Sequence, residues 1–487
     1  MAETADAQHE SPGRALPWVR FMPNIDTHAG GRNGTDESWL HEIEPRIAAL
    51  IQAEHVSLLI GSGLTTAIGY ELGASTQGME RMTLTSPLAP AIRREADASA
   101  MRMGRNNANV EDDIRAARQL LDGLKVAANL TGEPTGVDAD TSNASPSAAS
   151  FSAAARRYHD ELAKELDLLL TAFAKNVLAA ERGIRGGLTP AEPGPQQLEK
   201  ANAARRLLGS FLLTFASRAA SRERLHVFTT NYDRLLEFAC DLAGVHVLDR
   251  FVGSIEPVFR SSRLGLDLHY NPPGIRGEPR YVEGVVRLTK LHGSLDWRYQ
   301  HGPWGRREVV RTALPFGADD SHPAVGQQGS SIMIYPNAAK DVETLEYPYA
   351  DLFRDFAAAA CQPNGVVVTY GYGFGDDHVN RVLRDMLTLP STHLLIISFD
   401  DKDGRIAAFD ESVGRPAQVS VMVGAAVAGL ERLVSRFLPK PAIDRITWRL
   451  AELLERRGAV RRGLAVSDTT RAAGVPVEPG ESDDSTR

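Results

Sequence analysis

The chain has two cysteines, Cys240 and Cys361, among its 487 residues. They stand far apart and neither belongs to a Cys-x-x-Cys pair, which excludes a disulfide framework and a four-cysteine zinc site. So few cysteines are typical of a protein in a reducing compartment. The sequence also lacks an apolar run long enough to span a bilayer, so we expect no membrane association.

Positive charge is not in excess either. Lys and Arg number 54 against 62 Asp and Glu, which gives a formal net charge of -8. A non-specific binder of nucleic acid or of a membrane surface normally carries a basic balance, so we expect no direct nucleic-acid binding. The first residues are acidic and polar and lack the apolar stretch of a secretory signal. We therefore expect a cytoplasmic protein.

Composition divides the chain into an interrupted domain and three other segments. Residues 1–36 are rich in Gly, Asp, Glu, His and Thr and are expected to form an irregular arm. Residues 78–220 are rich in Ala, Leu, Arg and Glu and are expected to form a helical insertion. Its helical periodicity is clearest over three stretches, about 108–128, 150–182 and 196–220.

The residues from 465 to 487 are polar and rich in Pro and Gly, so we expect a disordered tail. What remains, 37–77 and 221–464, is expected to be one domain that the insertion interrupts. Its apolar patterns predict strands at 56–60, 226–230, 285–291, 331–335, 365–370, 393–399 and 419–423. Helical patterns stand between them, at 39–53, 234–242, 376–387, 404–409, 426–437 and 442–457.

This alternation of strands and helices predicts an α/β fold, a Rossmann-like, doubly wound parallel sheet with helices on both faces. In such sheets, ligands bind at the carboxyl ends of the strands. The residues that follow the strands are therefore the candidates for a functional site.

The first strand ends in Gly61-Ser62-Gly63-Leu64-Thr65. Glycines let a backbone approach a pyrophosphate, and the hydroxyls of Ser62 and Thr65 add donors. The segment lacks the full Gly-x-Gly-x-x-Gly pattern, and a tight turn between strand and helix is the alternative interpretation.

The second strand ends in Thr229-Thr230-Asn231-Tyr232-Asp233. The amide of Asn231 can bridge ribose hydroxyls or orient a water molecule. Asp233 directly precedes a helix, so it can serve as a cap. A turn or capping role stays open for both side chains.

The third strand ends in Leu291-His292-Gly293-Ser294. A histidine at a strand end suits proton transfer, because its ordinary pKa lies near working pH. A lone histidine is more often structural, and the sequence leaves that alternative open.

The strand at 365–370 ends in Gly371-Tyr372-Gly373-Phe374-Gly375. The glycines favour close approach of a ligand, and the two aromatic side chains can flank a ring. The acidic residues that follow, Asp376 and Asp377, are expected to suit the N-terminus of the next helix. At the end of the strand 393–399, Asp400 can accept bonds from ribose hydroxyls or cap a helix.

The four motifs together, in this order, resemble the sirtuin family, and more closely its branch in bacterial anti-phage defence. Thr229, Asn231 and Asp233 match the family's Thr-Gln-Asn-hydrophobic-Asp motif, with Thr230 in place of the glutamine, and His292 and Gly293 match its catalytic His-Gly. The resemblance covers about 55–70, 225–300 and 365–400 and leaves the insertion outside.

The chain also departs from the family pattern. Protein deacetylases of the family carry a zinc module built from two Cys-x-x-Cys pairs, which two cysteines cannot form. Ile68-Gly69-Tyr70-Glu71 stands where those enzymes have Gly-Ile-Pro-Asp-Phe-Arg. Both departures argue against removal of acyl groups from lysine. The cysteine count also argues against a zinc ion, and we predict no metal site.

The resemblance to the defence branch implies a zinc-free NAD hydrolase that depletes cellular NAD on phage infection, with Asn231 and His292 as catalytic residues. It implies NAD as substrate, held by Gly61, Ser62, Gly63, Thr65, Thr230, Asp233, Gly371, Tyr372, Gly373, Phe374 and Asp400. Some relatives assemble with a HerA-type hexameric ATPase, and others act alone or sense a phage trigger protein. We also expect a homo-oligomer.

Two alternatives stay open. One is a different enzyme, a deacylase or an ADP-ribosyltransferase, whose use of NAD depends on an acylated or acceptor protein. The other is a sensor that binds NAD or ADP-ribose without turnover. The pair of Asn231 and His292 argues against the sensor, because binding alone needs no base.

Overall fold

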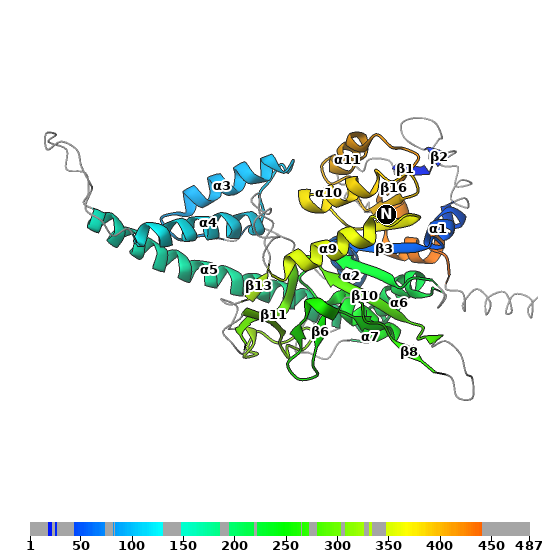
Figure 1. Ribbon diagram of the computed structural model, residues 1–487, viewed down its shortest axis with the longest axis horizontal. Coiled ribbons are helices and arrows are strands. Elements are labelled where there is room, and N and C mark those ends of the chain that lie inside the picture. The colour runs from blue at the N-terminus through cyan, green and yellow to red at the C-terminus, as the bar shows by residue number, and fades with distance from the viewer. Residues whose placement is uncertain are drawn as a thin grey trace, which may run out of the picture. The chain divides into compact units, whose positions relative to one another are not determined.

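The computed structural model (Figure 1) describes 18–21, 25–26, 43–73, 81, 83–129, 148–185, 194–218, 222–263, 265–271, 280–302, 307–325, 331–333 and 347–440. The helix expected at 442–457 and the tail expected from 465 lie outside these residues. So does most of the arm expected at 1–36. All elements named below belong to one unit, which ends at Pro439.

Within the described residues, the central sheet has nine strands in the order β2-β1-β16-β15-β14-β3-β4-β10-β5. Its strands are β1 (Trp18–Phe21), β2 (Ile25–Asp26), β3 (His55–Ile60), β4 (Leu225–Thr229), β5 (His246–Leu248), β10 (Val285–Lys290), β14 (Gly365–Tyr370), β15 (His393–Ser398) and β16 (Val419–Val423). From β16 to β5 every neighbouring pair is parallel. The parallel α/β sheet expected from the sequence is confirmed.

The chain order of the parallel strands is the doubly wound order. Counting β3, β4, β10, β14, β15 and β16 as strands one to six, the sheet reads 3-2-1-4-5-6, the Rossmann order. The order reverses between β3 and β14, and ligands bind in the crevice outside such a reversal. The predicted functional motifs follow strands on both sides of it.

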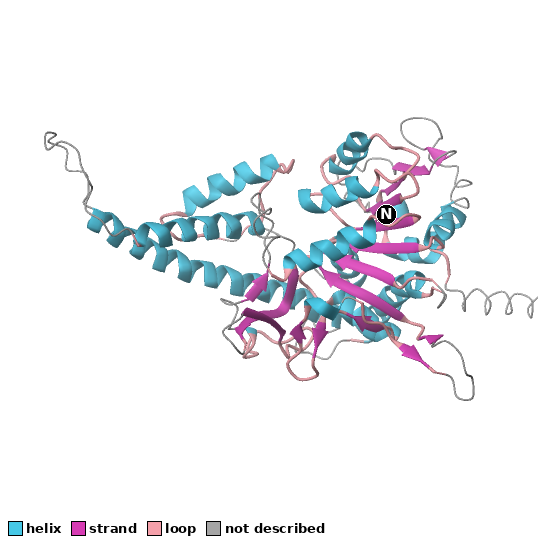
Figure 2. Cartoon of the chain, viewed as in Figure 1, coloured by secondary structure: helices cyan, strands magenta, loops and turns pink. Residues whose placement is uncertain are grey.

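Helices cover both faces of this sheet (Figure 2), because its inner strands are apolar on both sides. One face packs on α1 (Ile43–Ile51), α2 (Gly63–Leu72), α6 (Pro195–Ala216), α7 (Leu235–Ala243) and the π-helical turn η5 (Leu433–Phe437). The other packs on α9 (Tyr349–Ala360), α10 (Asp377–Met386) and α11 (Arg405–Val413). The helix expected at 426–437 is divided into α12 (Ala425–Ala428), α13 (Leu430–Arg432) and η5.

The insertion is helical, as its composition predicts. It contains α3 (Ala89–Arg102), α4 (Val110–Ala128) and α5 (Ala148–Arg185), and it runs into α6. Apolar side chains of α3, α4 and α5 form a cluster of their own, and Tyr232 from the loop after β4 inserts into that cluster. The insertion is therefore packed against the segment that carries Asn231.

A second sheet was not foreseen from the sequence. Its order is β13-β11-β12-β7-β6, with β6 (Phe251–Val252), β7 (Val258–Phe259), β11 (Gly293–His301), β12 (Arg307–Arg311) and β13 (Ser331–Met333). A separate two-stranded sheet is formed by β8 (His269–Tyr270) and β9 (Arg280–Tyr281). The strand expected at 331–335 forms as β13, but it pairs antiparallel with β11 and does not join the parallel sheet.

The N-terminal arm also differs from the expectation where it is described. Trp18–Phe21 pairs antiparallel with β16 and extends the main sheet at that edge. Val19 is fully buried, so a part of the arm contributes to the core. Among the described residues, no helix combines the length and the apolar character needed to cross a membrane.

Candidate functional site

The loop after β3 is held against the loop after β14. Gly63 N donates to the carbonyl oxygen of Gly371 at 3.0 Å. A Cβ on Gly61 would stand 2.6 Å from the Cα of Tyr372, and one on Gly63 would stand 2.5 Å from the Cα of Gly371. The glycines are thus required for two backbones to meet at the reversal of strand order.

The loop after β4 fixes Asn231 and Asp233 to the first loop. Asn231 Nδ2 donates to Gly61 O at 3.1 Å and to Thr65 Oγ1 at 3.3 Å. Thr65 Oγ1 in turn donates to Asp233 Oδ2 at 2.7 Å. Asp233 Oδ1 accepts from the backbone N of Leu235, the first residue of α7, at 3.1 Å, while the N-cap position itself is occupied by Arg234. Asp233 therefore binds the loop after β3 and the start of α7, and its role toward a ligand stays a prediction.

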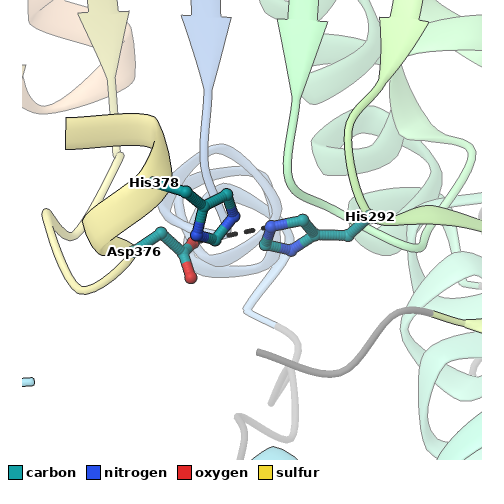
Figure 3. A group of neighbouring side chains, drawn as sticks. All are labelled: His292, Asp376 and His378. Carbon is teal, nitrogen blue, oxygen red and sulfur yellow. Dashed lines mark ion pairs between the residues drawn. The ribbon is translucent and has the colours of Figure 1, made fainter. Parts of the chain in front are cut away.

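His292 lies at the end of β10 and is almost fully buried. Its ring lies 6.2 Å from that of Tyr232, centroid to centroid, and 5.9 Å from that of His378. His292 Nε2 is 3.8 Å from Asp376 Oδ2. Figure 3 shows the ring of His292 directed at the side chains of Asp376 and His378, which belong to the start of α10.

The loop after β14 is braced by a buried tyrosine. The hydroxyl of Tyr372 shares its one hydrogen between Asn380 Oδ1 at 3.0 Å and the carbonyl oxygen of Asp376 at 3.2 Å. Burial, and then the charge of Asp376, raise the pKa of Tyr372 well above its usual value, so this hydroxyl stays a donor. Asn380 Nδ2 completes the loop by donating to Phe374 O at 3.0 Å.

These loops and the insertion enclose a cavity of about 310 Å³. Its size is at the lower end of the range for small-molecule sites. Most residues predicted for the site line it: Gly61, Ser62, Thr65, Thr230, Asn231, Asp233, His292, Gly371, Tyr372 and Gly373. The structure therefore brings the ends of four strands together at one cavity.

Three of the predicted residues do not line this cavity. Gly63 packs against Gly371 below it. Phe374 is buried beside Phe409 and lines a neighbouring cavity of about 580 Å³, which shares Gly375 and Arg405 with the first. Asp400 is exposed and pairs with Lys402 Nζ at 2.8 Å. Its expected role at a ribose stays a prediction.

The insertion supplies a wall of the cavity that sequence reasoning missed. Phe173, Val177 and Ala180 come from α5, and Arg105, Asn109 and Glu111 come from the junction of α3 and α4. Phe173 packs edge to face on Tyr232, with centroids 5.6 Å apart. Helical periodicity marks which face of α5 is buried, and it does not reveal what that face meets.

Three cationic side chains also line the cavity, namely Arg105, Lys402 and Arg405. Arg105 is paired with Asp112 at 2.6 Å, and Arg405 Nε donates to Lys402 O at 2.7 Å. Burial is the main cause that lowers the pKa of Arg405. Beside the N-terminus of α2, this charge suits an anionic ligand such as a phosphate.

The cysteines do not form a metal site. Cys240 is buried, and burial raises the pKa of its thiol to about 12, so it stays protonated. Burial raises the pKa of Cys361 as well. Among the described residues, the one group of three possible ligands whose atoms lie close together is His292, Asp376 and His378. His292 and Asp376 line this cavity, and His378 lines the neighbouring one.

The comparisons with known proteins agree with the fold. A family model described as a SIR2-like domain matches residues 225–414 of the chain. The matched segment runs from β4 through α11 and includes Asn231, His292 and the loop after β14. A search of curated proteins gave no match. The match supports a sirtuin-like family and an NAD-related function for this segment.

Proposed function

We propose that the cavity binds NAD and that water cleaves the bond between its nicotinamide and ribose, which gives nicotinamide and ADP-ribose. The main observation in support is that Gly61, Asn231 and His292 line one cavity at the reversal of strand order. The SIR2-like match over 225–414 supports NAD as the ligand. This proposal assigns each of the three strand ends a separate task.

The pyrophosphate of NAD is assigned to the loop of Gly61 to Thr65. Ser62 precedes the first residue of α2, and its side chain makes no capping bond to that helix. The amides at the start of α2 and the positive end of its dipole favour an anion there. Arg405 and Lys402 supply further positive charge at the same cavity.

Asn231 and His292 are assigned to the reaction centre. The C1′–N bond breaks and its electron pair leaves with neutral nicotinamide, while C1′ gains positive character. Water forms the new C1′–O bond and loses its proton to His292, directly or through a ribose hydroxyl. The Nδ2 of Asn231 donates hydrogen bonds to Gly61 and Thr65. Its Oδ1 is therefore the atom assigned to orient the water or the ribose.

The test is release of nicotinamide from NAD by purified protein, followed by chromatography. We expect Asn231→Ala and His292→Ala to lower release at least about 100-fold while keeping the fold, since general-base catalysis contributes about that much or more. His269→Ala is the control, because His269 is an exposed residue of β8 outside the cavity. Near-wild-type release by folded His292→Ala protein would overturn the assignment.

The same assay separates the alternative functions. A deacylase or an ADP-ribosyltransferase consumes NAD only when an acylated or acceptor protein is added. A sensor binds NAD or ADP-ribose in calorimetry and releases no nicotinamide under any condition. The absence of two Cys-x-x-Cys pairs from the sequence speaks against the deacylase.

We further propose that the activity serves anti-phage defence by depleting NAD, with a HerA-type ATPase or a phage protein as trigger and a homo-oligomer as the working form. The resemblance of the four motifs to the defence branch supports this step. A lethal NADase must be held inactive until triggered, so the assay is repeated in infected cells. The NAD pool should fall in cells with the wild-type protein and stay constant with His292→Ala.

A further inference from the structure

Three side chains of the kinds that bind metals lie close together where the two cavities adjoin: His292 and Asp376 line the smaller one and His378 lines the larger one. His292, Asp376 and His378 each offer one ligand atom, and these atoms all lie within 4.8 Å of one another. Among the described residues, this is the one such group of three or more His, Cys, Asp or Glu. Figure 3 shows that the group joins two elements, with His292 after β10 and the other two at the start of α10.

We propose that His292, Asp376 and His378 bind a divalent transition-metal ion of the zinc class. Two imidazoles and one carboxylate are a ligand set that zinc prefers, and zinc sites with three protein ligands keep a fourth position open. His292 and Asp376 both line the cavity, so a bound ion would lie next to the space assigned to NAD.

The spacing of the ligand atoms suits such an ion. Tetrahedral bonds of about 2.1 Å place neighbouring ligand atoms roughly 3.4 Å apart. His292 Nε2 and Asp376 Oδ2 are 3.8 Å apart, and the widest separation in the group is within 4.8 Å. These separations exceed the tetrahedral value, so the side chains must rotate toward a common point when an ion binds.

Neighbouring side chains hold the ligands in place, as surrounding contacts do in established metal sites. The ring of Phe353 packs edge to face on His378, with centroids 4.7 Å apart. The hydroxyl of Tyr372 donates to the carbonyl oxygen of Asp376, which fixes the backbone at that residue. The group is therefore braced before any ion binds.

A bound ion would inhibit the proposed cleavage of NAD. It would occupy the imidazole nitrogen that His292 needs as a base, and it would place charge where water must attack. This consequence rests on the proposed function, whereas the metal site rests on the geometry alone. The ion would thus act as an inhibitor, released before NAD is cleaved.

Binding is tested with tag-free protein from which metal has been stripped, because a polyhistidine tag binds the same ions. Co²⁺ serves as the visible-absorption probe, and Zn²⁺ serves as its competitor and as the calorimetric ligand. We expect one equivalent to bind. Asp376→Asn and His378→Gln should each weaken binding at least tenfold.

Asp377→Asn is the matched control. It makes the same charge change one residue away, on a side chain that is 72% exposed, and it should bind as the wild type does. Melting curves establish that each variant is folded, and His378→Gln decides the question if Asp376→Asn unfolds. Lack of binding by the wild type, or equal binding by folded His378→Gln, overturns the site.

Inhibition is measured separately, as nicotinamide release against Zn²⁺ concentration. Folded His378→Gln should need at least ten times more Zn²⁺ than the wild type for half-inhibition. Co²⁺ binding without nicotinamide release, by the purified protein and in infected cells alike, would overturn the proposed function and leave the metal site intact. Nicotinamide release without Co²⁺ binding would overturn the metal site and leave the proposed function intact.

Discussion

Gly63 and Gly371 meet backbone to backbone at the reversal of strand order. A Cβ on Gly371 would stand 2.6 Å from the Cα of Gly63, and Gly371 has a φ of +62°. This contact joins the first and fourth strands of the Rossmann order at their carboxyl ends. The floor of the cavity is therefore a backbone contact in which no side chain fits.

Gly371→Ala should lower the free energy of unfolding by about 3 kcal/mol or more, since the strained φ and the clash both oppose a methyl group. Gly373→Ala is the control. It lies two residues on, and the nearest atom to its new Cβ would be Arg405 Nη2 at 3.9 Å. Chemical denaturation measures both variants. Equal free energies of unfolding for the two variants would show that the contact between Gly63 and Gly371 tolerates a side chain.

Glu181 of the insertion forms a buried ion pair with Arg234, the residue before α7. Glu181 Oε2 lies 2.5 Å from Arg234 Nη2, and the side chains are 1% and 7% exposed. Glu181→Gln should lower the free energy of unfolding by about 3–5 kcal/mol, because it leaves the buried guanidinium of Arg234 without the charge of its ion-pair partner.

Asp320→Asn gives the comparison for that variant. Asp320 pairs with Arg182 at the surface and is 46% exposed, so its loss should cost at most about 1 kcal/mol. Urea denaturation measures both. A small effect of Glu181→Gln would mean that the insertion is not anchored through this pair.

The wall of the cavity contributed by α5 can be tested by filling it. Ala180 lines the cavity, whereas its neighbour Ala179 is exposed. Ala180→Trp should reduce nicotinamide release from NAD at least tenfold, which is about 1.4 kcal/mol in the transition state. Ala179→Trp should leave release unchanged. Equal rates for the two folded variants would remove α5 from the site.

Stability should depend on pH through His393 at the start of β15. Burial lowers the pKa of this imidazole to about 4, and the ordinary value of about 6.5 applies when the chain unfolds. Between these values the unfolded chain binds more protons. The free energy of unfolding should therefore fall as pH drops from about 6.5 to 4, by up to about 3 kcal/mol.

His393→Gln should reduce that dependence without abolishing it, because burial also lowers the pKa of His226 to about 4 and that histidine still titrates on unfolding. His269→Gln, at an exposed histidine, should retain it. Melts across this pH range measure the slopes. Identical slopes for His393→Gln and the wild type would assign the pH dependence to other groups.

Much of the fold follows from local sequence patterns. The strand predicted at 365–370 is β14 residue for residue, and the strand at 419–423 is β16. Both are short apolar runs buried on two faces, a pattern that each residue and its neighbours already carry. The strand-end motifs were found for the same reason, since each directly follows a strand.

Apart from β13, the strands of the second sheet escaped prediction because they carry no such pattern. β11 begins at Gly293, directly after His292, and its first six residues are buried despite the polar Ser294, Asp296 and Arg298. Their burial depends on partners elsewhere in the chain. Alternation along a single strand gives no sign of such partners.

The sequence by itself determined the parallel α/β core and placed Asn231, His292 and the glycine loops at strand ends, because hydrophobic periodicity and turn residues act over a few neighbours. Only the tertiary structure decided that Asp376 lies 3.8 Å from His292, that α5 lines the cavity and that Asp400 does not. Those relations join residues far apart in the chain, and packing alone brings them into contact.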